Sequence, residues 1–155
     1  MNKDKVLNSD WFQMADTDHQ VAKHLYLEMY PKPYEVICYH CQQAVEKYLK
    51  GILVYLNNHA IQKTHDLSFL LQECEERLDI SIDDKYYDIC DMLTPFGIAV
   101  RYPHELHVDE IIAKRAVDSV GVMKKMIDEA QDYLDKQSSS PQEKLLRTRV
   151  DELDL

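Results

Sequence analysis

Residues 34–56 have the sequence YEVICYHCQQAVEKYLKGILVYL, and this stretch decides the fold. Its apolar side chains recur every three or four residues, which is the period of an α-helix. They form two adjacent stripes, so the helix could contact neighbours over more than half of its circumference. At 1.5 Å per residue it would extend roughly 33 Å, the height of a small domain. We therefore predict a central helix surrounded by the other helices of a bundle. The two stripes are Ile37, Cys41, Ala44, Tyr48 and Ile52, and Cys38, Val45, Leu49, Leu53 and Leu56.

The narrow remaining face of this helix is polar. It carries Gln43, Glu46, Lys47 and Lys50, which are three or four residues apart and therefore lie in one row. Glu46 and Lys50 have the favourable order for an exposed ion pair worth ~0.3 kcal/mol. The alternative is that the row lines a groove for an anionic ligand. Any chemistry on the central helix is expected along this row.

The length and composition of the chain favour one helical domain. A chain of 155 residues with 45% hydrophobic content can bury one ordinary core. Only three glycines and five prolines are present, which favours long helices with short connections. We expect an all-α, up-and-down bundle of four to five helices over residues 1–136. Residues 137–155 begin with a serine-rich linker and continue as a charged tail, which we expect to be flexible or to fold on a partner.

The charge and the cysteine content restrict the possible functions and locations of the protein. The formal net charge of −10 argues against a broad basic surface for nucleic acid, so any RNA contact would have to be local. The first ten residues contain no apolar run typical of a signal peptide, and no segment has the ~18 consecutive apolar residues of a membrane span. We expect a cytoplasmic protein without a membrane contact. The four cysteines suit buried core positions in a reducing compartment, so neither a metal site nor a cofactor is expected.

Helix boundaries follow from caps and prolines. The first helix is expected to begin at Asn8 or Ser9 and to end before Pro31. Thr64 is a candidate N-cap for the third helix, which carries apolar residues as far as Leu78. The fourth is expected over residues 86–93, with residues 96–100 as a kinked last turn or a separate piece. The fifth is expected from about residue 109 to residue 136.

Four passages in this order resemble the HEPN domains (higher eukaryotes and prokaryotes nucleotide-binding). The resemblance covers most of residues 9–135 and implies a small helical bundle. It rests on Trp11 with Ala15 and Asp18, on QQAVEKYLK at 42–50, on KTHDL at 63–67, and on RYP at 101–103. Many members of this family resemble metal-independent ribonucleases that act as homodimers, and many are toxins paired with a separate minimal nucleotidyltransferase. This chain has no nucleotidyltransferase motif of its own.

The ribonuclease members have an arginine followed a few residues later by a histidine. Arg101 and His107 are separated by five residues and fit that spacing. A histidine near neutrality can accept the proton of an attacking 2′-hydroxyl, and an arginine can bind the charge that grows on the phosphate. Tyr102 and Pro103 depart from the family pattern, because proline prevents a regular helix between the two residues. Asp109 stands where some toxins have a tyrosine that the nucleotidyltransferase modifies.

Three functions follow as expectations. The first is a dimeric nucleotide- or RNA-associated module that acts with a nucleotidyltransferase, the second a ribonuclease toxin with catalytic Arg101 and His107, and the third a non-catalytic interaction bundle. Arg101 is predicted to approach the polar row of the central helix. The segment Thr64 to Asp66 is interpreted as a helix start with an imidazole held by a carboxylate, and a catalytic dyad is the alternative. The expected ligand-binding residues are Gln43, Glu46, Lys47, Lys50, Lys63 and Arg101.

Overall fold

The computed structural model describes residues 3–56, 63–99 and 107–137, and its regular elements within these ranges are all helices. This confirms the predicted all-α bundle. Three helices are long and three are short, and the four-residue α5 is a separate piece rather than a continuation of α4. The helices are α1 (Lys3–Glu28), α2 (Tyr34–Tyr55), α3 (Leu67–Leu78), α4 (Asp84–Leu93), α5 (Phe96–Ala99) and α6 (Glu110–Gln137).

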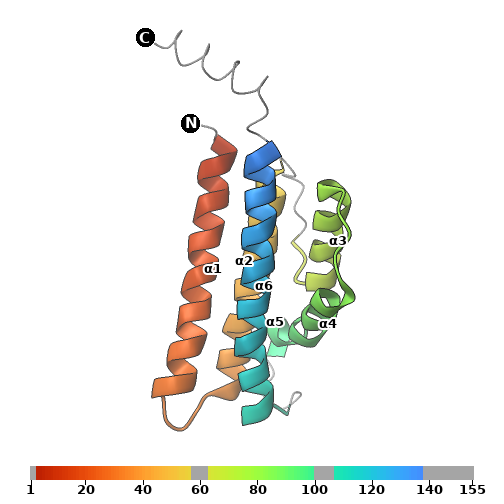
Figure 1. Cartoon of the computed structure of the whole chain (residues 1–155). Coiled ribbons are helices and arrows are strands. Elements are labelled where there is room, and N and C mark those ends of the chain that lie inside the picture. The colour runs from red at the N-terminus through yellow and green to blue at the C-terminus, as the bar shows by residue number, and fades with distance from the viewer. Residues whose placement is uncertain (1–2, 57–62, 100–106, 138–155) are drawn as a thin grey trace, which may run out of the picture.

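Helix α2 occupies the centre of the bundle, as its sequence predicted. It packs against α1, α3, α4, α5 and α6 (Figure 1). Both predicted apolar stripes are buried along nearly their whole length. Burial of apolar surface at about 25 cal/mol per Å² is the main favourable term in folding, so α2 organises the core. The buried residues of α2 are Ile37, Cys38, Cys41, Gln42, Ala44, Val45, Glu46, Tyr48, Leu49, Lys50, Gly51, Ile52, Leu53 and Val54.

Helices α1 and α2 are antiparallel, whereas α2 and α6 run in the same direction (Figure 1). Two contacts fix the parallel pair. Lys32, just before α2, forms a 3.2 Å ion pair with Glu110 at the start of α6. The Tyr55 hydroxyl at the end of α2 donates a 3.1 Å hydrogen bond to Asp135 near the end of α6. The chain reverses direction between α1 and α2. The short helices α3 to α5 then bring it back to the end of the bundle where α2 begins, so that α6 runs parallel to α2.

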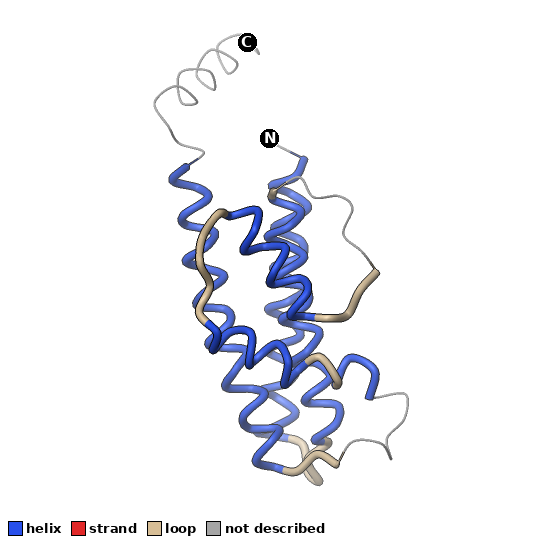
Figure 2. The backbone as a smooth tube through the Cα atoms, turned by 90° about the vertical axis from the view of Figure 1, so that its right-hand side faces the viewer, coloured by secondary structure: helices blue, strands red, loops and turns tan. Residues whose placement is uncertain are grey.

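The short helices α3 and α4 lie together on one side of the long helices (Figure 2). Their apolar residues join the same core through Leu67, Leu71, Cys90 and Leu93. The Thr94 hydroxyl accepts a 3.1 Å hydrogen bond from the backbone N–H of Leu67, which ties the start of α3 to the end of α4. The beginning of α3 is thus held against α2.

Two predicted helix starts are wrong. Helix α1 begins at Lys3 rather than at Asn8 or Ser9. No glycine or proline lies between residues 3 and 28, so helix propagation past these two polar residues costs little. Helix α3 is capped by Asp66 rather than Thr64, because the Asp66 carboxylate accepts hydrogen bonds from the N–H groups of Ser68 and Phe69. The prediction for α6 was within one residue at each end.

The four cysteines are buried, in agreement with their interpretation as core residues. Desolvation raises the pKa of the Cys38 and Cys90 thiols to about 12, and it raises the pKa of Cys41 and Cys74 as well. These thiols are therefore protonated at neutral pH and behave as small apolar side chains.

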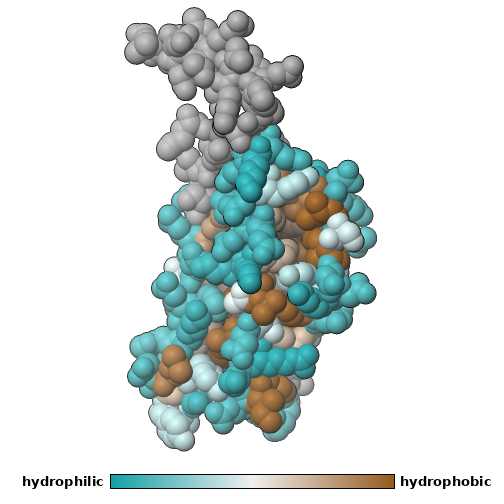
Figure 3. Space-filling model, viewed as in Figure 1, coloured by the Kyte–Doolittle hydropathy of each residue, from teal (hydrophilic) through white to brown (hydrophobic). Residues whose placement is uncertain are grey.

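The face shown in Figure 3 is mainly hydrophilic in its described part, with separate hydrophobic patches. No helix in the described part of the chain combines the length and apolar character needed to cross a membrane. The predicted tail begins at the last residue of α6, and residues 138–155 lie outside the described residues.

Candidate functional site

Polar side chains follow two sides of α2, and each side centres on one carboxylate. We call the residues Asp18, His40 and Lys47, between α1 and α2, the Asp18 cluster. We call the residues Gln42, Glu46, Lys50 and His65, between α2 and α3, the Glu46 cluster. Gln43 lies between them and donates a 2.7 Å hydrogen bond to the side-chain oxygen of Gln42. The two clusters and Gln43 form one continuous polar strip.

The Asp18 cluster is a partly buried ion pair with a histidine beside it. The Asp18 side chain is 12% exposed and accepts from Lys47 Nζ through one oxygen. Its other oxygen lies 2.9 Å from Nδ1 of His40, which therefore carries the donated proton. His40 is 25% exposed. Both donors come from α2 at a spacing of seven residues, which places them on one side of that helix.

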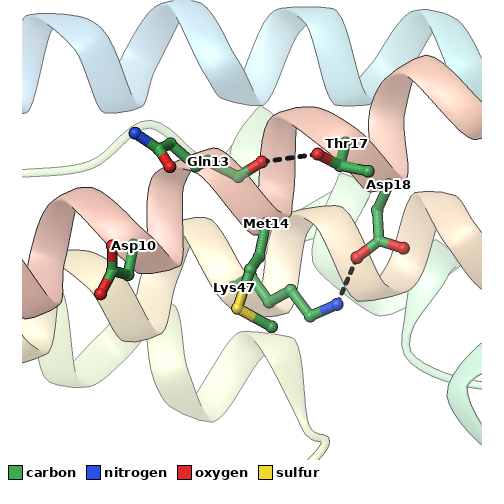
Figure 4. A pocket seen from close by; sticks show the side chains of 6 residues that line it. All are labelled: Asp10, Gln13, Met14, Thr17, Asp18 and Lys47. Atoms are coloured by element: carbon green, nitrogen blue, oxygen red, sulfur yellow. Dashed lines mark hydrogen bonds and ion pairs between the residues drawn. The ribbon is translucent and has the colours of Figure 1, made fainter.

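A depression of about 570 Å³ opens beside the Asp18 cluster. Figure 4 shows Lys47 reaching from α2 toward Asp18, with the side chains of α1 around it. Asp10, Asp18 and Lys47 are its charged lining residues, and half-exposed Met14 provides an apolar surface. The depression therefore offers an apolar contact next to a paired lysine. Its lining residues are Asp10, Gln13, Met14, Thr17, Asp18 and Lys47.

The Glu46 cluster is more deeply buried. The Glu46 side chain is only 6% exposed, and its Oε1 lies 2.6 Å from Nδ1 of His65 and 3.3 Å from Nε2 of Gln42. Its Oε2 lies 3.5 Å from Nζ of Lys50, whose side chain is 10% exposed. One carboxylate thus accepts hydrogen bonds from a histidine and an amide and forms an ion pair with a lysine. A buried carboxylate with these three partners is held in a single orientation.

The chain holds His65 from both its backbone and its ring. Its carbonyl oxygen accepts a 3.4 Å hydrogen bond from Nε2 of Gln42, and the next residue, Asp66, caps α3. Nδ1 of the ring is committed to Glu46, while the side chain as a whole is 57% exposed. The free edge of the imidazole is therefore the Nε2 edge.

Helix α5 closes against the Glu46 cluster. A Cβ atom built on Gly97 would lie 2.9 Å from Cδ of Gln42, so only glycine allows this approach without a shift of the amide. Gln42 itself is fully buried. Helix α5 ends at Ala99, two residues before Arg101 in the sequence.

A family model for the HEPN domain matches residues 9–135. The chain belongs to the HEPN domain family. Two solved structures are similar to this HEPN domain in fold. TT1696 from Thermus thermophilus is 24% identical with a TM-score of 0.65, over 79% of this chain and 97% of TT1696. ST0689, an archaeal HEPN homologue, is 20% identical with a TM-score of 0.62, over 79% of this chain and 95% of ST0689. No curated protein matches the chain.

The HEPN domain places four of the predicted ligand residues on α2, but in a different setting from the one expected. Glu46 and Lys50 are paired, yet both are buried, so the prediction of an exposed ion pair is wrong. Tertiary contacts from α3 and α5 cover this side of the helix. Gln43 and Lys47 are half-buried and connect to the two clusters. The helical spacing brought these residues together, and the neighbouring helices decided their exposure.

The remaining predicted site residues lie in the connections. Lys63 is exposed in the segment before α3. His107 is exposed before α6, next to the buried Val108. Arg101 lies outside the described residues, so its approach to the polar strip stays a prediction. Within the described ranges, no group of three or more histidine, cysteine or acidic side chains has the arrangement to hold a metal ion.

Sequence reasoning missed Gln42, His40 and the role of Asp18. The interpretation of His65 as an imidazole held by a carboxylate is correct, but the carboxylate belongs to Glu46 rather than to a neighbouring residue. Glu46 and His65 are 19 residues apart, and Asp18 and His40 are 22 apart. Pairs so distant in sequence have no periodic signal, because periodicity reports only the face of a single helix.

Proposed function

We propose that this HEPN domain binds RNA or a nucleotide along the polar strip of α2. The observation that carries the proposal is the Glu46 cluster, in which a buried carboxylate fixes an exposed imidazole and a lysine at defined positions. The ammonium group of a lysine is suited to phosphate oxygens, and the fixed imidazole presents its Nε2 edge to the strip. The depression beside Asp18 adds an apolar contact for a base or ribose.

The burial of charge on α2 supports a function rather than a purely structural role. A buried charged pair is often no more stabilising than apolar residues of the same volume, because each charge loses its hydration. The strip buries Glu46 and Lys50 within the helix that organises the core. A cost of this kind is typical of positions where a defined polar geometry is used. A net charge of −10 is compatible with this proposal, because a few local cations can contact a phosphate without a broad basic face.

The ligand residues in this proposal are Lys63 and Arg101 as direct phosphate contacts, with Gln43, Glu46, Lys47 and Lys50 shaping the strip. Lys63 is exposed and lies two residues before His65. Arg101 follows α5, whose Gly97 packs on Gln42.

The proposal includes partners. A homodimer would place two polar strips in one assembly, and a separate minimal nucleotidyltransferase would act on or with it in the cytoplasm. Family membership supports both, together with large exposed apolar side chains at the end of the bundle where α1 ends and α6 begins, which are Leu27, Tyr30 and Ile111. Light scattering at micromolar concentration tests the dimer, and copurification with the product of an adjacent gene tests the partner.

A second candidate function is a metal-independent ribonuclease that uses Arg101 and His107. The observation that favours it is the position of His107. This residue is exposed, while burial of the next residue, Val108, anchors the backbone beside it. Cleavage of total RNA by the wild type, lost in Arg101→Ala and in His107→Ala, would support this function. Full cleavage by either variant would contradict it.

Binding is tested directly by fluorescence anisotropy with a labelled single-stranded RNA and with a labelled nucleotide. The double variant Lys63→Gln/Arg101→Gln is expected to weaken binding by about tenfold or more and to reduce the salt dependence by about two phosphate contacts. Arg115→Gln is the matched control, because Arg115 is an exposed cation on α6 away from the strip. No binding by the wild type at micromolar protein, or equal loss in the control, would contradict the proposal.

A further inference from the structure

We infer that Glu46 and His65 form a proton-transfer dyad, in which Nε2 of His65 accepts the proton of an RNA 2′-hydroxyl. This inference rests on the proposed binding of RNA at the polar strip, and it differs from the Arg101–His107 candidate in the residue that acts as the base. The reacting histidine sits on the segment before α3 rather than before α6.

The geometry is that of an oriented general base. Glu46 is buried and accepts the Nδ1 proton of His65 at 2.6 Å, so the ring is held in the tautomer with a free Nε2. A carboxylate on Nδ1 also stabilises the imidazolium that forms when Nε2 accepts a proton. The ring is 57% exposed, so a substrate can reach the Nε2 edge. The base is therefore both oriented and accessible.

Glu46 is itself held in place by contacts with Gln42 and Lys50. Gln42 bonds both to Glu46 and to the backbone carbonyl of His65, so one amide links the two members of the dyad. Lys50 lies 3.5 Å from the second oxygen of Glu46 and holds that oxygen in an ion pair. Gly97 allows α5 to press on Gln42 from the other side. An exposed ion pair without these contacts would lose its geometry to side-chain motion.

Two other histidines, His40 and His107, are less suited to the same role. His40 also bonds a carboxylate, but Asp18 is shared with Lys47 and the His40 ring is only 25% exposed. His107 is exposed, and among the described residues no carboxylate lies within hydrogen-bond distance of its ring. His65 alone of the three combines a buried carboxylate partner with a mainly exposed ring.

The reaction balances without a cofactor. The 2′-oxygen forms a bond to the adjacent phosphorus and its proton passes to Nε2 of His65. The bond from phosphorus to the 5′-oxygen breaks, and that oxygen takes a proton from solvent. The products are a 2′,3′-cyclic phosphate and a 5′-hydroxyl, and water later recovers the proton from His65. Lys63 is two residues away, within about 7.6 Å of backbone reach, and can bind the phosphate charge.

The test compares cleavage and binding on the same single-stranded RNA, in EDTA, with a matched RNA whose ribose at the scissile position lacks the 2′-hydroxyl. Wild type is expected to cut only the ribose form and to leave a cyclic phosphate. His65→Ala is expected to reduce cleavage at least about 100-fold, far more than it weakens RNA binding. Added imidazole is expected to restore part of the His65→Ala activity. His24→Ala is the control, because His24 is an exposed histidine on α1.

Glu46 is tested as a positioning residue by separating kcat from KM. Glu46→Gln removes the carboxylate that orients the His65 ring, so kcat for cleavage is expected to fall at least about tenfold while KM changes less than about twofold. Circular dichroism tests whether Glu46→Gln is folded. If this variant does not fold, the rescue of the surface variant His65→Ala by imidazole decides the inference.

The outcomes separate the two proposals. RNA binding without cleavage by the wild type overturns the dyad and leaves the proposed function intact. Full cleavage by His65→Ala, or activity on the RNA without the 2′-hydroxyl, also overturns the dyad. Absence of RNA binding overturns the proposed function first, because the dyad has no substrate without it.

Discussion

The two sides of α2 carry the same chemical groups in different surroundings. Each side has a carboxylate, a lysine and a histidine, but Asp18 belongs to the neighbouring helix α1 whereas Glu46 belongs to α2 itself. Lys47 and Asp18 are 18% and 12% exposed, and Lys50 and Glu46 are 10% and 6% exposed. The histidines show the reverse order, since His65 is mainly exposed and His40 is not. Only the α3 side combines a carboxylate this deeply buried with a mainly exposed imidazole, which is the combination that the proposed dyad uses.

The largest expected losses of stability come from removing the two carboxylates. Glu46→Ala should lower the free energy of unfolding by about 3–5 kcal/mol, because it leaves the buried Lys50 without its partner. Asp18→Ala should cost less, about 1.5–3 kcal/mol, since Lys47 can reach solvent. Urea denaturation followed by circular dichroism measures both. Equal losses in the two variants would show that the difference in burial has no energetic consequence.

The next largest losses of stability are expected at two glycines, Gly51 in α2 and Gly97 in α5. Gly51→Ala should cost about 1–3 kcal/mol, because a Cβ there would lie 2.6 Å from the Phe12 ring of α1. Gly97→Ala should cost a similar amount through Gln42, and it should also disturb the Glu46 cluster. Denaturation midpoints of the two variants measure these costs.

A double-mutant comparison separates the two sides. Phe12→Leu should recover part of the stability in the Gly51→Ala variant and none in Gly97→Ala, because Phe12 contacts only the first position. Recovery in both variants would contradict the assignment of the clashes.

A gain is expected at the third glycine. Gly121 lies in α6 with no atom within 4 Å of an added Cβ, outside both sides of α2. Gly121→Ala should therefore raise the free energy of unfolding by about 1 kcal/mol through helix propensity alone. A higher thermal midpoint checks this, and a loss of stability would mean that α6 has a neighbour at this position.

The smallest effect is pH-dependent and belongs to the α1 side. Desolvation lowers the pKa of His19, with Lys23 and Lys124 acting in the same direction, while a hydrogen bond to Val117 and the charge of Asp16 oppose it. Nε2 of His19 is buried without a hydrogen-bond partner among the described residues. The folded state therefore binds fewer protons than the unfolded state below the unfolded pKa of about 6.5.

The lowered pKa of His19 makes the folded state less stable at acidic pH. The contribution of His19 is complete above about pH 6.5 and is lost as the pH falls from there through the folded pKa. His19→Gln cannot titrate, so its free energy of unfolding should fall less steeply than that of the wild type between about pH 7 and about pH 5. Denaturation series at several pH values measure the slopes, and parallel slopes would exclude His19 as the cause.

Much of the fold could be predicted because it depends on local patterns. The two stripes of α2 predicted its central position, and the apolar period predicted α3, α4 and α6. The start of α1 was wrong because capping preferences are weaker than uninterrupted helix propagation, and the cap of α3 shifted from Thr64 to Asp66 by two residues within one short polar segment. Four predicted ligand residues do share α2, but their burial depends on which helices cover them.

The sequence by itself determined which residues of this HEPN domain share a helix face, because an α-helix converts spacing of three and four residues into neighbours. It also determined that α2 must be surrounded, since a helix with two apolar stripes cannot be stable with one of them in water. Only the tertiary structure decided that Asp18 meets His40 and that Glu46 meets His65. Those contacts join side chains from different helices, and they form only when packing of the whole core brings α1 and α3 against α2.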